Sequence, residues 1–253
     1  MKKILYYLSC CMFLLAVSSC DIDNYDEPNE TLKGEIIDKN TGKSIQVDAT
    51  NDNGIRLKLM ELSWSDNPQP YYFYCMQDGT FNNTKIFKGN YNVVPQGPFV
   101  PLIQKSEDGK TIVDESKTLD IKGTVELKWE VEPFLNVEWI GELIVNANGS
   151  ITAKVKVTRG TTNPEYQDNV IDIWLMVNSS SPHVGEGNYD SRYTKKLSGD
   201  DANNALGKEI TLTTEGEFSK NRTYYIRVGA RIDHSIEGAK RFNFNESKTV
   251  NVL

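Results

Sequence analysis

The chain has 253 residues, of which 28 are Lys or Arg and 35 are Asp or Glu, so its formal net charge at pH 7 is −7. A chain of this length can bury two hydrophobic cores, and its negative charge argues against a nucleic-acid partner. It has two histidines, which limits the metal sites and catalytic triads that the sequence can build.

The N-terminus has the three parts of a signal peptide. Lys2 and Lys3 are basic, residues 4–17 are mostly apolar, and small residues precede Cys20. About 14 apolar residues span roughly 21 Å as a helix, which is too short for a stable transmembrane segment. We therefore expect residues 1–19 to be a signal peptide that is removed.

Residues 17–20, with the sequence VSSC, resemble a bacterial lipobox. In a lipobox, small residues precede a cysteine whose thiol receives a diacylglycerol. The resemblance implies that Cys20 becomes the first residue of the mature chain and carries acyl chains that anchor it in a membrane. An ordinary secretory signal followed by a chance cysteine is the alternative.

Residues 20–30 are rich in acidic side chains and predict a flexible, solvated tether after the lipid. An acidic stretch in this place resembles the surface-export signal of Bacteroidota lipoproteins, which implies an outer-membrane protein that faces the cell exterior. In enterobacterial sorting, by contrast, an Asp in the position of Asp21 implies retention in the inner membrane. Without residues 1–19 the chain has 26 bases against 35 acids, a formal charge of −9.

The cysteine count excludes an intramolecular disulfide in the mature chain. Cys10 and Cys11 leave with the signal peptide and Cys20 is the expected lipid site, so Cys75 is left alone. A lone cysteine in a strand is typically a small buried apolar residue, and we expect this for Cys75.

Residues 31–132 contain short runs in which apolar and polar residues alternate, a pattern that predicts β-strands. Thr41-Gly42 and Asp78-Gly79 suit tight turns, and Phe81 and Tyr91 can lie on an inner face. The pattern around these residues resembles the carboxypeptidase-regulatory-like, or transthyretin-like, β-sandwich. The resemblance implies a fold and no peptidase activity.

The segment WSDNPQPYYFYC places five aromatic rings around a proline-rich loop. If Cys75 at its end faces the core, the period of two along a strand turns Tyr71 and Phe73 inward with it. The same period turns Tyr72 and Tyr74 outward.

Trp64, at the start of this segment, lies where a strand is expected to enter the loop. We take Trp64, Tyr72 and Tyr74 as the candidate glycan-binding residues, because aromatic faces suit the C–H faces of sugars. One alternative is that these rings cover the edge of the sandwich or the interface between domains. Another is that they contact a protein.

Four stretches identify a more specific resemblance: DNYDEP at residues 23–28, LSWSDNP at 62–68, DGTFNNTK at 78–85 and GPFVP at 97–101. They resemble a family of two-domain outer-membrane lipoproteins of unknown function, which Bacteroidota encode beside SusC/SusD-type polysaccharide-uptake pairs. The resemblance implies location and genomic neighbours. The family has no catalytic residues that could be assigned to this chain.

Pro133 marks the expected boundary of a second domain, residues 133–253. In its clearest strand, Tyr224 and Ile226 begin an apolar face that continues to Ala230, whereas Tyr225 and Arg227 lie on the other face. This strand resembles the penultimate strand of a fibronectin type III or immunoglobulin-like sandwich. A second sandwich of this kind is therefore expected.

A hairpin is predicted around Asn148-Gly149, a pair that can supply the positive φ angles of a type I′ turn. After the turn, alternation from Ile151 to Val157 predicts a strand with one inward face. One short helical turn is expected at residues 200–206, closed by Gly207.

Neither His183 nor His234 has metal-ligand spacing around it, so no metal, no cofactor and no Ser-His-Asp triad is expected. A glycosidase needs only two suitably placed carboxylates, and acidic residues are abundant, so an unrecognised hydrolase is the enzymatic alternative. We nevertheless expect a protein that is not an enzyme.

These patterns predict an all-β chain with two tandem β-sandwich domains, transthyretin-like and then fibronectin III/immunoglobulin-like. The expected function is that of a non-enzymatic, surface-anchored accessory lipoprotein of a polysaccharide-utilisation system, which captures or presents glycan. Expected partners are the outer membrane through the lipid anchor, a polysaccharide or oligosaccharide, and SusC/SusD-type proteins. The alternative is a structural subunit of a SusC/SusD-type transporter complex that binds no glycan.

Overall fold

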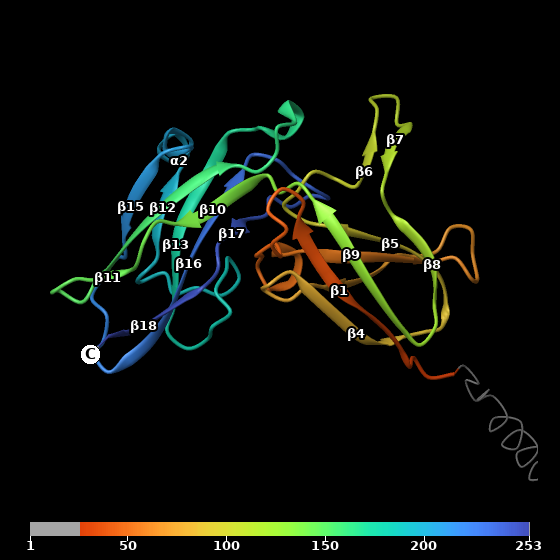
Figure 1. Ribbon diagram of the computed structural model, residues 1–253, viewed down its shortest axis with the longest axis horizontal. Coiled ribbons are helices and arrows are strands. Elements are labelled where there is room, and N and C mark those ends of the chain that lie inside the picture. The colour runs from red at the N-terminus through yellow and green to blue at the C-terminus, as the bar shows by residue number, and fades with distance from the viewer. Residues whose placement is uncertain (1–25, 253) are drawn as a thin grey trace, which may run out of the picture.

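The computed structural model describes residues 26–252 of the chain, so the expected signal peptide, the lipidation site Cys20 and the first part of the tether lie outside the described residues. The described chain is almost entirely β, with two sandwiches one after the other (Figure 1), and this predicted fold class is confirmed. Across residues 26–252, no helix is long and apolar enough to cross a membrane.

The first domain packs a three-stranded sheet, in the order β4-β1-β9, against a four-stranded sheet, in the order β3-β2-β5-β8. Strands β1 and β9 are parallel, and the other pairs are antiparallel. A separate hairpin, β6-β7, extends from this domain (Figure 1). The elements are β1 (Glu30–Asp38), η1 (Asn51–Asn53), β2 (Arg56–Glu61), β3 (Tyr71–Tyr74), β4 (Thr80–Ile86), β5 (Gly89–Gln96), β6 (Ile103–Lys105), β7 (Thr111–Asp114), β8 (Lys117–Ile121) and β9 (Thr124–Val131).

The second domain also has two sheets. In one, β12 pairs with β10 and β11 along one edge and with β15 along the other; in the second, the order is β14-β13-β16-β17, and β18 also pairs with β16. The elements are β10 (Leu135–Trp139), β11 (Ile144–Val145), β12 (Ile151–Arg159), η2 (Pro164–Tyr166), β13 (Val170–Asn178), β14 (Lys195–Ser198), α2 (Asp200–Ala205), β15 (Glu209–Thr213), β16 (Arg222–Ile232), β17 (Asn243–Phe244) and β18 (Lys248–Val252).

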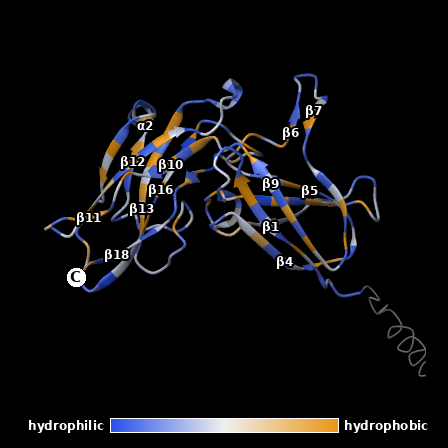
Figure 2. Cartoon of the chain, viewed as in Figure 1, coloured by the Kyte–Doolittle hydropathy of each residue, from blue (hydrophilic) through white to orange (hydrophobic). Residues whose placement is uncertain are grey.

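Each domain buries its own cluster of apolar side chains, which explains why the strands form where alternation predicts them. Leu32 and Phe81 belong to the first cluster, and Val155 and Tyr224 belong to the second. Figure 2 shows apolar residues concentrated along the strands and polar residues in most of the connecting loops. The apolar stripe of β12 faces inward as predicted, because Ile151 and its alternating partners as far as Val157 are buried.

The predicted type I′ turn at Asn148-Gly149 is wrong. Gly149 has a φ of 81°, but Asn148 is not among the residues with positive φ. The turn runs from Asn146 to Gly149, whose N–H donates to the Asn146 carbonyl at 2.8 Å, and only its last residue needs the left-handed conformation. This longer hairpin loop places a single glycine where a side chain would be strained.

The two domains are joined through a buried arginine. Arg227 of β16 is fully buried, and its guanidinium donates to the carbonyl oxygens of Asn245 and Val184 in its own domain, at 2.7 and 3.1 Å. It also donates to the carbonyl of Val47 in the first domain, at 2.7 Å. Burial lowers the pKa of Arg227 to about 9, and the nearby Asp48 carboxylate opposes that shift. The group therefore stays charged at neutral pH.

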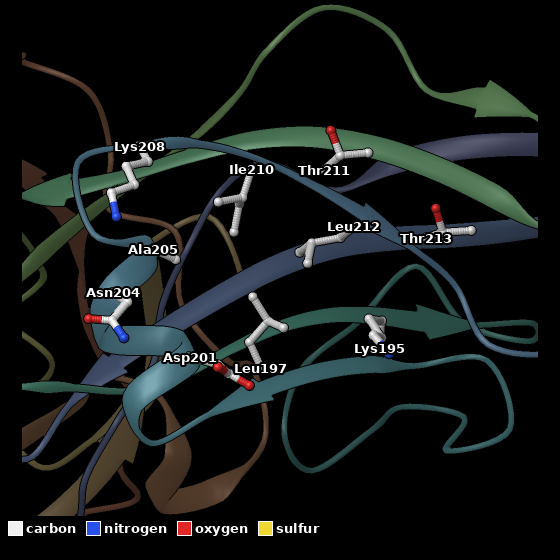
Figure 3. Close-up of a pocket in the computed structure, with 10 residues that line it drawn as sticks. All are labelled: Lys195, Leu197, Asp201, Asn204, Ala205, Lys208, Ile210, Thr211, Leu212 and Thr213. Atoms are coloured by element: carbon white, nitrogen blue, oxygen red, sulfur yellow. The ribbon is translucent and has the colours of Figure 1, made fainter.

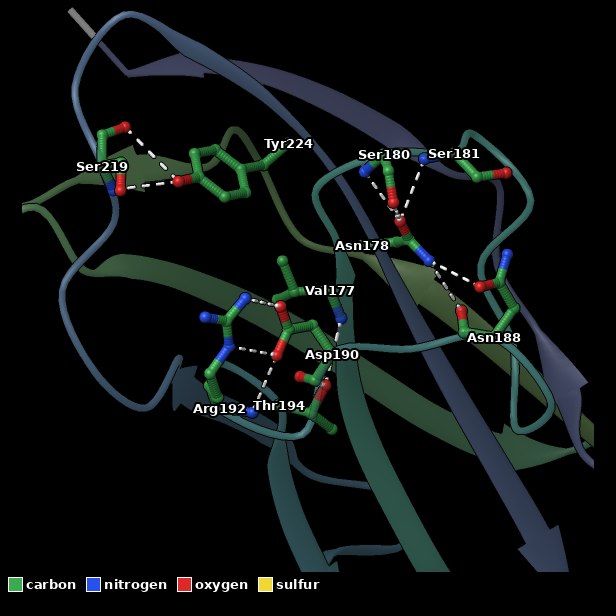
Figure 4. Close-up of polar contacts among 10 residues, drawn as sticks. All are labelled: Val177, Asn178, Ser180, Ser181, Asn188, Asp190, Arg192, Thr194, Ser219 and Tyr224. Atoms are coloured by element: carbon green, nitrogen blue, oxygen red, sulfur yellow. Dashed lines mark hydrogen bonds and ion pairs between the residues drawn. The ribbon is translucent and has the colours of Figure 1, made fainter.

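The loop between β13 and β14 presses against the first domain. It is held by Asn178, whose side-chain oxygen accepts from the N–H groups of Ser180 and Ser181 and whose amide donates to Asn188 (Figure 4). Gly185 in this loop lies against Asp48, and a Cβ there would come within 2.3 Å of the carboxylate. A side chain at this position would therefore displace the buried Asp48 carboxylate or push the two domains apart.

Candidate functional site

Three exposed aromatic side chains lie at the end of the first sandwich. Trp64, Tyr71 and Phe87 are 69%, 49% and 47% exposed. In Figure 1 the β2–β3 loop and the start of β1 both lie at the end of this domain that points away from the second domain. Large exposed rings that gather at one place on a surface are typical of an interaction site.

Two adjoining pockets lie beneath these rings. One has a volume of about 250 Å³ and is lined by Leu59, Glu61, Gln69, Tyr71, Lys85, Ile86, Phe87 and Tyr91. The other has a volume of about 770 Å³ and is lined by Asp26, Glu27, Asn29, Glu30, Glu61, Trp64, Phe87 and Lys88. Both pockets are lined by Glu61 and Phe87, so we treat them as one site. We call this site, with the lining residues of both pockets, the end cleft.

The end cleft forms because the apolar stripe of the sandwich stops before its strands do. Leu59 pairs with Tyr71, and the next inward position of β2 is Glu61, which pairs with Tyr91 of β5. Leu59 is fully buried, whereas Tyr71 lies at the end of an edge strand and is half exposed. The gap between the two sheets therefore opens to solvent at this point.

The turn between β4 and β5 presents Phe87 to the cleft. The hydroxyl of Tyr91 donates to the Phe87 carbonyl oxygen at 2.9 Å, which fixes the backbone under this ring. Burial and the neighbouring Glu61 carboxylate raise the pKa of Tyr91 to about 12, so its hydroxyl keeps its proton at neutral pH. Phe87 was not selected from the sequence; its signal is an aromatic residue directly after a strand and before a turn.

The β2–β3 loop is attached to the same edge of the sheet. Asn90 donates its backbone N–H to the Ser63 hydroxyl at 2.8 Å, and the Leu62 N–H donates to the Asn90 carbonyl at 2.7 Å. The indole N–H of Trp64 donates to Glu61 Oε1 at 2.7 Å. These contacts orient the Trp64 ring over the cleft while most of its surface faces solvent.

The structure does not bring the three sequence-predicted rings together. Trp64 follows the last residue of β2, whereas Tyr74 pairs with Arg56 at the first residue of that strand and donates from its hydroxyl to Asp52 at 3.1 Å. The Arg56 guanidinium lies over the Tyr72 ring, with its Cζ 4.4 Å from the ring centroid. Whether Tyr72 and Tyr74 bind glycan stays a prediction, but they line neither pocket of the end cleft.

Tyr71 and Phe73 of β3, and Cys75 just after it, face the side that the alternation predicts, but Tyr71 is half exposed. Cys75 is buried, and burial raises the pKa of its thiol, so it does not provide a thiolate nucleophile. Phe73 packs against the first core and contacts Phe81 edge-on, with 6.1 Å between ring centroids. Tyr71 points to the same side, but the core has ended there.

The polar groups of the end cleft can hydrogen-bond to a ligand. Lys85 and Lys88 provide ammonium donors and Gln69 provides an amide. Glu61 and the acidic tether residues provide carboxylates.

Within residues 26–252, no three His, Cys, Asp or Glu side chains lie close enough to hold a metal ion. His234 instead packs against Phe134 and Tyr166 and contacts Asp168 through Nδ1 at 2.8 Å.

A further pocket of about 450 Å³ lies in the second domain between β14, α2 and β15 (Figure 3). Leu197, Ile210 and Leu212 point into it, with Lys195 and Lys208 at its sides. No aromatic ring lines this pocket, and its leucine and isoleucine side chains pack against or belong to the second core. It is the open side of the sandwich and is less suited to sugar rings than the end cleft.

Comparisons with known proteins agree with this architecture. Residues 30–132 match the family model described as "Protein of unknown function (DUF3823) N-terminal domain". A solved structure of a DUF3823 family protein from Bacteroides uniformis is 40% identical to this chain, with a TM-score of 0.82, and the match covers 89% of this chain and 100% of that one. No curated protein matches the chain.

Two more distant structures share the fold over the same length. One, from Bacteroides uniformis, is described as a "putative carbohydrate binding protein"; it is 21% identical, has a TM-score of 0.68, and is matched over 89% of this chain and 100% of its own. The other, a DUF3823 family protein from Parabacteroides merdae, is 19% identical, has a TM-score of 0.65 and is matched over the same shares.

Proposed function

This chain belongs to the DUF3823 family of proteins of unknown function, and from its end cleft we propose that it captures or presents glycan as a non-enzymatic, surface-anchored accessory lipoprotein of a polysaccharide-utilisation system. The observation that carries the proposal is the gathering of Trp64, Tyr71 and Phe87 around one cleft. A structural relative is described as a "putative carbohydrate binding protein", which supports the same function.

The chemistry of the end cleft fits a sugar chain. Aromatic faces stack on the apolar C–H faces of sugar rings, and each such contact contributes about 1 kcal/mol. Carboxylates, ammonium groups and an amide beside the rings can hydrogen-bond to the hydroxyls at the edges of the same sugars. Glu61 is suited to both tasks, since it holds Trp64 and lines both pockets.

The position of the cleft fits a protein anchored at its N-terminus. Asp26, Glu27 and Glu30 of the tether line the cleft. An extended chain from Cys20 to Asp26 spans at most about 20 Å, so a lipid on Cys20 would keep the cleft close to the membrane surface. Glycan bound there would lie near outer-membrane transporters, and SusC/SusD-type proteins are the partners that we propose.

Binding and turnover by the purified mature chain test the proposal. We expect the protein to be retained by at least one of the neutral polysaccharides xylan, mannan, starch and mixed-linkage β-glucan, with no release of reducing sugar. Release of reducing ends would identify a hydrolase and contradict the proposal. Retention by none of them, together with capture of a SusC/SusD-type pair, would favour the structural subunit that binds no glycan.

A further inference from the structure

A second recess lies where the two domains meet, far along the first sandwich from the end cleft. It has a volume of about 400 Å³ and is lined by the turn that follows β1, by strand β10 and by residues 243–246. We call it the interdomain groove. Its volume lies within the range of pockets that hold small ligands, and such pockets often occur between domains.

One side chain of this groove has an unused hydrogen-bond donor. Asn245 is 5% exposed, its Oδ1 accepts from the Val228 N–H at 2.8 Å, and its Nδ2 has no hydrogen-bond partner within the described residues. A buried amide without a partner costs about 1–3 kcal/mol. A ligand that supplies an acceptor oxygen would remove this cost, so Asn245 marks the groove as a place for a polar ligand.

The charges around the groove select the class of ligand. Three acidic residues, Asp38, Glu138 and Glu246, line it against one basic residue, Lys43, which disfavours an anion. The Asp38 carboxylate already accepts from the Asn40 N–H and the Thr41 hydroxyl, which leaves those of Glu138 and Glu246 for a ligand. A cation would leave the Asn245 N–H donor without an acceptor. A neutral molecule with many hydroxyl groups satisfies both conditions, because each hydroxyl accepts from an amide and donates to a carboxylate.

The walls of the groove are held in place before any ligand arrives. Asn243 accepts from the Leu135 N–H at 3.1 Å and donates to the Pro98 carbonyl of the first domain at 2.9 Å. Asn40 donates across the boundary to the Gly160 carbonyl at 3.0 Å. Together with Arg227, these contacts fix one domain against the other, and a preformed site binds without the cost of ordering its walls.

We propose that the interdomain groove is a second subsite for neutral glycan, in which a sugar hydroxyl accepts from Asn245 Nδ2 and Asn136 and Glu138 hydrogen-bond at the rim. This inference rests on the proposed function, because it assigns a second site for the same class of ligand. Two sites on one rigid chain would hold a long polysaccharide more tightly than either site alone.

The four tryptophans allow both sites to be followed in one experiment. Trp64 lines the end cleft and Trp139 lines the groove, where its indole N–H donates to the Glu246 carbonyl at 2.8 Å. Trp129 and Trp174 are buried elsewhere and serve as internal controls. The indole N–H signals of the ¹⁵N-labelled mature chain, assigned with single Trp→Phe variants, are recorded while cellohexaose, maltohexaose, xylohexaose and mannohexaose are added in turn to millimolar concentration.

At least one of these hexasaccharides should shift the Trp139 signal and leave those of Trp129 and Trp174 in place. Glu138→Ala should weaken this response about fivefold, the loss of roughly one hydrogen bond. Glu209→Ala is the matched control, because Glu138 and Glu209 flank Lys156 on the same sheet and Glu209 lies outside the groove. It should leave the response unchanged.

The outcomes separate the groove from the proposed function. A shift of Trp64 without any shift of Trp139 would overturn the groove and leave glycan binding at the end cleft intact. A shift of Trp139 alone, weakened by Glu138→Ala, would support the groove and contradict the end cleft. If none of the hexasaccharides moves the Trp139 signal, the groove is not a glycan subsite.

Discussion

Arg227 Nη1 and the carbonyl oxygen of Val47 lie 2.7 Å apart, and this hydrogen bond crosses the boundary between the two domains. The same guanidinium bonds to two carbonyls of its own domain. Three buried acceptors thus depend on one side chain, which makes Arg227 a test of how strongly the domains are coupled.

Replacing Arg227 with Met should lower the free energy of unfolding by about 3 kcal/mol or more, because it leaves buried carbonyls without donors. Urea unfolding measures the change. Arg222→Met, at the exposed start of the same strand, should cost less than about 0.5 kcal/mol. Equal losses in the two variants would mean that Arg227 does not join the domains.

The rings that matter for binding should be those of the end cleft. Tyr71→Ala should weaken glycan binding several-fold, since one stacked ring contributes about 1 kcal/mol. Tyr72→Ala and Tyr74→Ala should leave affinity unchanged, because these rings lie with Arg56 and Asp52. Calorimetric titration of the three variants checks this. The reverse order of effects would restore the platform predicted from the sequence and reject the end cleft.

Phe73→Ala should destabilise the first domain by about 2–3 kcal/mol, less than a fully buried phenylalanine would, because Phe73 is only partly buried. Its edge-on contact with Phe81 is lost and the core is left open to solvent. Thermal unfolding gives the value. A cost below 1 kcal/mol would show that the edge strand does not hold the core closed.

Stability should depend on pH through Glu132. Hydrogen bonds from Lys39 and then Thr161 hold the pKa of Glu132 below its ordinary 4.5. A depressed pKa contributes stability that is present above the ordinary value and is lost as pH falls through the folded-state pKa. Glu132 is partly exposed, so the contribution is at most about 1 kcal/mol.

Glu132→Gln should therefore be less stable than the natural chain at pH 7, and the difference should shrink as the pH falls below 4.5. Urea unfolding over this pH range measures it, with the exposed Glu107→Gln as the control variant. A difference that stays constant with pH would show that the charge of Glu132 contributes nothing.

Cys20→Ala should abolish incorporation of labelled fatty acid in the native host, because we propose that the Cys20 thiol carries the lipid. Cys75→Ala is the control and should be labelled normally, since Cys75 is buried in the first core. Normal labelling of the Cys20 variant would show that the anchor has been assigned to the wrong residue.

Local patterns predicted much of the fold. Alternation from Ile151 to Val157 decides which face of β12 is buried, since only neighbouring residues are needed to define that face. The turn at Asn148-Gly149 was predicted with the wrong geometry, because the loop length is set by where β11 ends and not by the dipeptide alone.

Features that depend on packing between distant segments were not visible in the sequence. Arg227 lies on the polar side of its strand, and nothing local shows that a second domain covers it. Tyr71 faces inward as predicted, yet it lies where the core stops and becomes part of a cleft. Phe87 joins Trp64 only because two loops meet at the same end of a sandwich.

The most direct test compares the mature chain with the double variant Trp64→Ala/Phe87→Ala by affinity electrophoresis in gels that contain the retained polysaccharide. Both side chains are exposed, so the double variant should unfold at the same temperature as the natural chain. The account predicts that the natural chain is retarded and the double variant migrates as it does in a gel without polysaccharide. Equal retardation of the two proteins would contradict glycan binding at the end cleft.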